Sequence, residues 1–103
     1  MSRADAVADL HRALELSQEL VRVAESGDVG QVVRLDAERL RLLKSVRHAL
    51  QPLSPADRSM LRAIADLNAR SVGRMEHRFR AKCRDMDMLS AGRRAVRAYT
   101  HHR

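Results

Sequence analysis

The chain has 103 residues, a length that is typical of a single domain and excludes a large multidomain enzyme. Hydrophobic residues make up 45% of the sequence and aromatic residues only 2%, so the core must consist mainly of Leu, Val, Ala and Met. The 4 Gly and 2 Pro residues are too few for an all-β chain with many tight turns. These counts favour a small helical bundle.

The formal net charge of +7 comes entirely from the second half of the chain. Residues 1–51 contain 8 basic and 8 acidic residues, whereas residues 52–103 contain 12 basic and 5 acidic residues. A basic half can bind an acidic partner, nucleic acid or an anionic membrane surface. However, 18 of the 20 basic residues are Arg, and a GC-rich genome produces this bias without any ligand. We give this second explanation more weight.

The cysteine content and the lack of long apolar runs indicate the compartment. The single cysteine, Cys83, cannot form a disulfide within the chain and is typical of a cytoplasmic protein. No run approaches the ~18 apolar residues that span a membrane, and the N-terminus lacks the apolar core of a signal peptide. We therefore expect a cytoplasmic protein without a membrane-spanning segment.

The first two helices are predicted over about residues 3–24 and 29–50. In both, apolar residues recur at spacings of three and four, and Ser2 and Asp28 are suitable N-caps. Arg39 falls within the apolar stripe of the second helix. Either its stem packs in the core while its guanidinium reaches water, or the guanidinium meets a buried acid such as Asp36 or Glu38. We favour the first alternative.

The third helix is predicted over about residues 55–89, because Pro52 stops the second helix and Ser54 can cap the next one. It would be about 50 Å long, against about 33 Å for each of the first two helices. It must therefore project beyond them, bend back near Gly73, or be covered by another element.

The C-terminal part is predicted to be broken at residues 90–92. Residues 93–99 would form a short helical segment, and residues 100–103 would be disordered. The predicted fold is thus all-α, an antiparallel three-helix bundle with a long third helix and a short C-terminal helical segment, in one domain over residues 1–103.

The sequence contains no constellation of residues that predicts catalysis, a cofactor or a metal site. Arg70, Arg74 and Arg78 form a cationic ridge at helical spacing, which could follow a phosphate backbone. Such a ridge usually needs base-reading or stacking residues beside it to recognise nucleic acid, and none is interleaved here. We therefore rank a solvated Arg face first, an acidic protein partner second and nucleic acid third.

A second candidate surface is apolar. Met86, Met88 and Leu89 lie beyond the reach of the shorter helices and could form a groove for a partner helix, reversibly covered by residues 93–99. The same stripe could equally pair with a second copy of the chain.

Several features are similar to those of the FliT-type flagellar export chaperones. A Gly-Asp helix junction precedes a Leu, then Glu-Arg, then a Leu pair, as in the second helix of that family, and Asn68 and the basic ending with Ala and Tyr fit the same pattern. The junction and second-helix residues are Ala24-Glu25-Ser26-Gly27-Asp28, Val32, Leu35, Glu38-Arg39 and Leu42-Leu43, and the ending is Arg94-Ala95-Val96-Arg97-Ala98-Tyr99.

The resemblance implies a cytoplasmic helical chaperone that binds the filament-cap protein and keeps it unassembled before export. Family members also contact the flagellar master regulator and components of the export apparatus, and Tyr99 matches the tail tyrosine associated with docking at the export gate. By the same resemblance, the partner groove would be lined or bordered by Val72, Met75, Phe79, Met86 and Leu89. The alternative is a basic helical protein that binds nucleic acid or regulates transcription through Arg70, Arg74 and Arg78.

Overall fold

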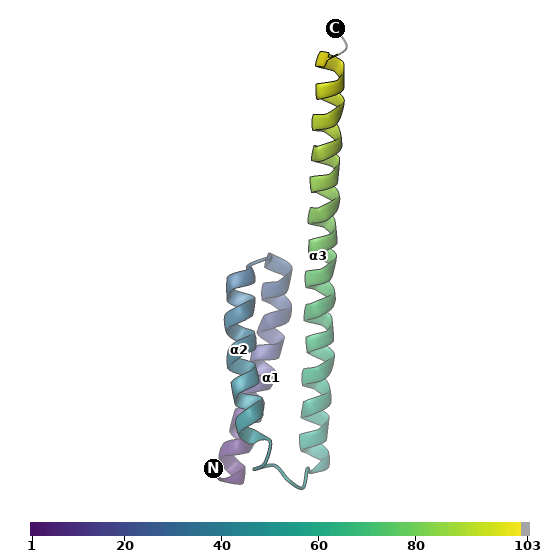
Figure 1. The fold of residues 1–103 in the computed structure, drawn as a ribbon. Helices are drawn as coiled ribbons and strands as arrows, with labels where there is room; N and C mark the ends of the chain where they lie inside the picture. The colour runs from purple at the N-terminus through teal and green to yellow at the C-terminus, as the bar shows by residue number, and fades with distance from the viewer. Residues whose placement is uncertain (102–103) are drawn as a thin grey trace.

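The structure of the chain, a computed structural model, describes the backbone of residues 1–101 and the side chains of residues 1–94, 96 and 97. This part of the chain forms three helices, α1 (Arg3–Ser26), α2 (Val29–Val46) and α3 (Pro55–His101), and contains no strand. The predicted all-α fold is therefore confirmed. The chain reverses direction at both connections, so α1 and α2 form an antiparallel pair and α3 runs beside them (Figure 1).

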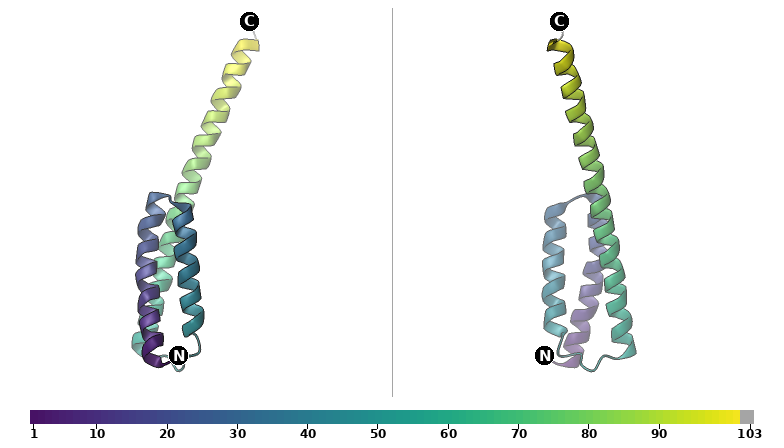
Figure 2. Two further views of the ribbon diagram at one scale, coloured as in Figure 1. Left: turned by 90° about the vertical axis from the view of Figure 1, so that its left-hand side faces the viewer. Right: turned by 45° about the vertical axis from the view of Figure 1, so that its right-hand side comes forward.

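The helix α3 is much longer than its neighbours and projects beyond them. Its 47 residues correspond to about 70 Å, against about 36 Å for the 24 residues of α1. The molecule accordingly measures 77 × 21 × 19 Å. Both views in Figure 2 show the C-terminal half of α3 leaving the bundle at the end where α1 and α2 are joined. The sequence left three arrangements open for a long third helix, and the structure shows the first of them, in which the helix projects beyond the bundle.

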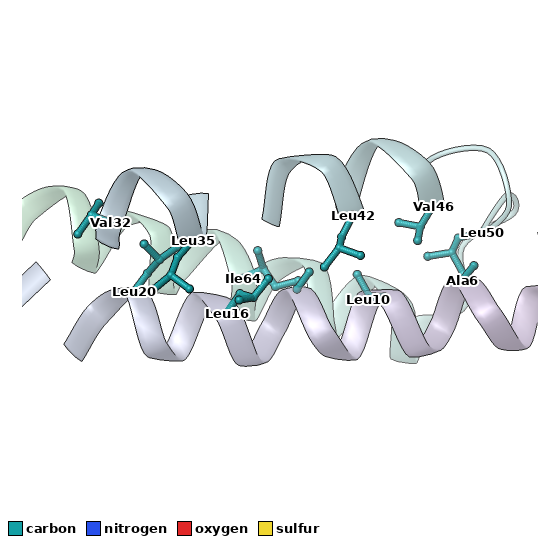
Figure 3. Packing of buried hydrophobic residues seen from close by; sticks show 11 residues of the cluster. Ala6, Leu10, Leu16, Leu20, Val32, Leu35, Leu42, Val46, Leu50 and Ile64 are labelled. Atoms are coloured by element: carbon teal, nitrogen blue, oxygen red, sulfur yellow. The ribbon is translucent and has the colours of Figure 1, made fainter. Parts of the chain in front are cut away.

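The core is centred on α1, which packs against both α2 and α3. Figure 3 shows apolar side chains of α1 and α2 facing each other, with Ile64 contributed by α3. Full burial of one Leu side chain stabilises the fold by about 1.5–3 kcal/mol, so the buried Leu residues of this cluster contribute strongly to stability. The buried cluster consists of Ala6, Leu10, Ala13, Leu16, Leu20, Val32, Leu35, Leu42, Val46, Leu50 and Ile64.

The helix α3 begins at a reciprocal capping box. Ser54 Oγ accepts the backbone N–H of Asp57, and Asp57 Oδ2 accepts the backbone N–H of Ser54, both at 3.1 Å. Arg3 Nη2 donates to the same Asp57 oxygen at 2.7 Å and so ties the start of α1 to the start of α3. The backbone N–H of Ser54, together with the Ser54 hydroxyl and the Arg3 guanidinium, lowers the pKa of the buried Asp57 carboxyl below its ordinary value of 3.8.

Arg39 lies inside the bundle and does not reach water, so the favoured prediction for this side chain was wrong. Only 7% of the residue is exposed. Its Nη2 donates to Asp36 Oδ1 at 2.6 Å and to Asn68 Oδ1 at 2.7 Å, and its Nη1 donates to Ser17 Oγ at 3.4 Å. A buried cation is costly without such acceptors, and each helix supplies one of them. The second alternative is right about the partner Asp36 but wrong about its burial, because the side chain of Asp36 is 55% exposed.

The helix α2 ends at Val46, four residues earlier than its apolar pattern indicates. Pro52 lacks the N–H that a continuing helix would donate to the carbonyl of His48, and that carbonyl instead accepts from Gln51 at 3.4 Å. The following turn still places Leu50 in the core, where it is 2% exposed. The apolar pattern thus marks burial correctly but extends past the end of the helix.

The predicted break at residues 90–92 is absent, and α3 continues through it. One Gly in a helix costs only about 1 kcal/mol relative to Ala, and no Pro follows Gly92 to end the helix. Residues 93–99 are therefore part of α3 and not a separate segment that folds back. The helix also includes Thr100 and His101, which we expected in a disordered tail, and residues 102–103 lie outside the described residues.

Candidate partner-binding surface

The part of α3 that projects beyond the bundle, residues 79–101, carries large apolar side chains on its surface. Phe79, Met86, Leu89 and Val96 are each exposed over 62% or more of their area. They are separated by seven, three and seven positions, which places them on one face of a helix. We call these four residues the projecting stripe. Contiguous exposed apolar patches mark interaction sites more often than isolated apolar residues do.

The projecting stripe continues the face through which α3 packs in the bundle. Ile64 is buried and Met75 packs against the core cluster. Met75 follows Ile64 by eleven positions and Met86 follows Met75 by eleven, and eleven positions are close to three full turns. One apolar face of α3 is therefore buried in its first half and exposed to solvent in its second half.

A cleft lined by apolar and charged side chains lies where α3 leaves the bundle. Ala24 at the end of α1, Val29 and Val32 at the start of α2, and Met75 and Phe79 on α3 all line it. Phe79 belongs both to the cleft and to the projecting stripe, so the two surfaces are continuous. A partner helix on the stripe would therefore meet the α1–α2 junction at one end.

Two of the three residues of the predicted cationic ridge bind the end of α1. Arg74 donates to the carbonyl oxygen of Val21 at 3.4 Å and pairs with the carboxylate of Glu25, and Arg78 donates to the carbonyl oxygen of Glu25. The Glu25 carbonyl is among the last four of α1, which lack partners within the helix and carry its negative dipole end, so a guanidinium group binds it well. Arg70 is exposed. The ridge thus serves largely to hold α3 against α1.

The predicted partner-binding residues fall on three parts of α3. Met75 and Phe79 line the cleft, whereas Met86 and Leu89 lie on the projecting stripe. Val72 lies beside the bundle and is 46% exposed. The structure therefore brings four of these five residues onto one continuous surface.

The sixth predicted residue, Tyr99, belongs to α3, but its side chain lies outside the described residues. Sequence reasoning missed the contribution of α1 and α2 to the cleft, where Ala24, Val29 and Val32 form one wall. The one feature of the sequence that could have indicated this wall is an apolar residue, Val29, directly after the helix cap Asp28. Whether that residue faces α3 depends on how the helices are arranged in space.

The described residues offer little other chemistry. They contain no group of three or more His, Cys, Asp or Glu side chains that could hold a metal ion. Cys83 is a free, half-buried cysteine on α3. In the part of the chain that the structure describes, no helix is long and apolar enough to span a bilayer. The arrangement is best suited to contact with another protein segment.

The model of the family described as flagellar protein FliT matches residues 7–101, nearly the whole chain and all of the surface described above. The chain belongs to this family. The resemblance found in the sequence is thereby confirmed. FliT proteins are flagellar export chaperones of the cytoplasm that work with partners of flagellar export, and the family is not known for enzymatic activity. Comparisons with curated proteins and with solved structures gave no match.

Proposed function

We propose that this FliT protein binds the filament-cap protein in the cytoplasm through the projecting stripe and the adjoining cleft. Binding keeps the cap protein unassembled until it is exported. The observation that carries the proposal is the apolar face of α3, which packs against the core up to Met75 and is exposed from Phe79 onwards. A chaperone of the export pathway needs such a surface to cover an apolar segment of its cargo.

The geometry supports a helical occupant. The projecting part of α3 contains 23 residues, which correspond to about 34 Å, and its apolar side chains follow helical spacing. An amphipathic helix of similar length can lie along such a face with its apolar side chains at positions i, i+3, i+4 and i+7. The occupant would then cover the part of α3 that α1 and α2 are too short to reach.

The proposal is tested by titrating the full chain with the filament-cap protein from the same cell, at about 50 mM and about 500 mM salt. A random DNA duplex serves as the control ligand. Because the contact is mainly apolar, cap-protein affinity should change little with salt, whereas phosphate binding by Arg side chains would fall steeply. Undetectable cap-protein binding together with salt-sensitive DNA binding would contradict the proposal.

A matched pair of variants locates the surface. Met86→Asp with Leu89→Asp places two charges on the projecting stripe and should abolish cap-protein binding while the helical circular dichroism is kept. Ala91→Asp is the control, because Ala91 is exposed and lies on the side of α3 opposite the stripe. Equal affinity of the double variant and the wild type would remove the stripe from the proposal.

We further propose that components of the export apparatus bind at the C-terminal end of α3. The support is the match of Tyr99 to the tail tyrosine of the family. Tyr99→Ala should weaken binding to the export gate without changing cap-protein affinity. Loss of both affinities would show that residue 99 acts on the cargo surface instead.

A further inference from the structure

Two cations lie within the projecting stripe. Lys82 precedes Met86 by four positions, and Arg93 follows Leu89 by four, so the order is cation, apolar, apolar, cation at positions i, i+4, i+7 and i+11. All four positions fall on one side of α3, because eleven residues make about three turns. The two cations are about 16 Å apart along the helix axis. They frame the central apolar pair of the stripe.

These two cations have no counter-ion in the described part of the chain. Neither Lys82 nor Arg93 forms an ion pair there, although both are exposed. The projecting residues 79–101 contain six basic and two acidic side chains. One of the two acids, Asp85, lines the cleft together with Lys82 and a second hollow together with Leu89 and Arg93, and the other, Asp87, lies off the stripe. The exposed surface along the projecting stripe is therefore apolar and carries more basic than acidic side chains.

We propose that the occupant of the projecting stripe is an acidic amphipathic helix, whose carboxylates pair with Lys82 and Arg93 and whose apolar residues cover Met86 and Leu89. This inference rests on the proposed function, in which the helix belongs to the filament-cap protein. Docking would bury the aliphatic stems of both cations against the partner. A partner without acids at these two places would leave two partly desolvated cations unpaired, which is unfavourable.

A second copy of the chain is a poor occupant for the same reason. In an antiparallel pair centred between Met86 and Leu89, Lys82 of each copy would lie against Arg93 of the other. In a parallel pair in register, each cation would lie against its own equivalent. Both arrangements bring like charges together at two points of a short interface, and like charges across a helix pair are destabilising.

The spacing defines the partner sequence. Two helices that pack side by side have the same rise per residue, so the partner should carry Asp or Glu at positions i and i+11 and apolar residues at i+4 and i+7. This order is the same when read in either direction. The stripe can therefore accept the helix parallel or antiparallel to α3.

The test uses the full chain and the full-length cap protein. Lys82→Glu with Arg93→Glu should weaken binding about tenfold or more at about 100 mM salt, because two attractions become two repulsions. Arg80→Glu with Arg84→Glu is the matched control, because it changes the net charge equally on the other side of α3. It should change the affinity less than about twofold. Equal effects of the two double variants would mean that only net charge matters, and would overturn the inference.

The outcomes separate this inference from the proposed function. If Lys82→Glu with Arg93→Glu binds the cap protein like the wild type, while Met86→Asp with Leu89→Asp does not bind, the proposed function stands and the acidic partner is wrong. If the wild type does not bind the cap protein at all, the proposed function fails. Sedimentation measures whether the wild type is a dimer. If it is, and if Met86→Asp with Leu89→Asp makes it a monomer, the occupant of the stripe is a second copy of the chain and not an acidic partner.

A peptide measurement tests the surface chemistry without the cap protein. The probe is a helical peptide of about 20 residues with Glu at i and i+11 and Leu at i+4 and i+7, compared with the same peptide carrying Gln at both acidic positions. The Glu peptide should bind the wild type about five to ten times more tightly. The preference should disappear in Lys82→Glu with Arg93→Glu. Equal affinity of the two peptides for the wild type would overturn the inference.

Discussion

Arg39 of α2 donates a hydrogen bond to Asn68 of α3, with 2.7 Å between Arg39 Nη2 and Asn68 Oδ1. The bond connects the two helices that flank α1, which itself packs against both. Arg39 is buried whereas Asn68 is exposed, so the amide brings an acceptor to the guanidinium from the rim of the core. The same guanidinium binds Asp36 and Ser17, and all three helices therefore meet at one cation.

We expect Asn68→Ala to lower the free energy of unfolding by about 1–2 kcal/mol, because it removes an acceptor from a buried cation. In an Arg39→Met background the same substitution should cost little, since no guanidinium remains to be satisfied. Urea unfolding of the two single variants and the double variant gives the coupling between the residues. Strictly additive effects would contradict a direct role of this bond in stability.

Gly27 and Arg78 give a second stability prediction. Gly27 has φ 79°, and a Cβ atom there would lie 2.5 Å from Arg78 Nη2. Gly27→Ala should therefore cost about 1–2 kcal/mol from backbone strain alone, and it should also displace the Arg78 guanidinium from the end of α1. Thermal unfolding is the measurement.

Gly92→Ala is the matched control for that substitution. Gly92 lies within α3 and a Cβ atom there would meet nothing within 4 Å. Because Ala is the better helix former, this variant should be as stable as the wild type or more stable, by up to about 1 kcal/mol. Destabilisation by Gly92→Ala similar to that of Gly27→Ala would show that the left-handed conformation at Gly27 is not the cause.

Asp57 makes stability depend on pH. Its pKa in the folded chain is lowered below 3.8, mainly by the hydrogen bond from the backbone N–H of Ser54. The unfolded chain therefore binds a proton before the folded chain does, and the stabilisation is complete above the unfolded pKa and is lost as pH falls through the folded pKa. Asp57→Asn should flatten the loss of stability from about pH 5 to about pH 2. An unchanged slope in that range would exclude this carboxyl as the source.

How far the sequence predicts this fold depends on whether a feature is local. The capping residues Ser2, Asp28 and Ser54 mark helix starts, because each bonds to an N–H group three residues away. The excess length of the third helix likewise follows from a pattern without Pro. The break at residues 90–92 was predicted wrongly, because a single Gly is too weak a signal to end a helix whose other residues favour it.

Features that depend on distant residues were harder to predict. Arg39 was expected to reach water, and its acceptor Asn68 lies 29 residues away on another helix. Arg78 was assigned to a cationic ridge, whereas its partner, the carbonyl oxygen of Glu25, is 53 positions distant. The apolar residues of α3 beyond the bundle were predicted as a partner surface because helix lengths alone leave them uncovered. The wall of the cleft formed by Val29 was missed, because neither the helix lengths nor the spacing of apolar residues indicates that Val29 faces α3.

The projecting part of α3 should be dispensable for folding. A chain that ends after Arg84 keeps every residue of the buried core cluster. Its free energy of unfolding should therefore stay within about 0.5 kcal/mol of the wild type, while its affinity for the cap protein is lost. Urea unfolding and titration of the same shortened protein check both statements. A large loss of stability would mean that residues 85–101 pack against the bundle.

Hydrogen exchange of the full chain, with and without the filament-cap protein, tests the central claim most directly. Free in solution, the backbone amides of residues 79–101 should exchange faster than those of α1, because no core packing supports this part of α3. Binding should slow exchange across residues 79–101 and at the α1–α2 junction and leave the middle of α1 unchanged. Protection confined to the outer face of α2, with no change in residues 79–101, would contradict the account.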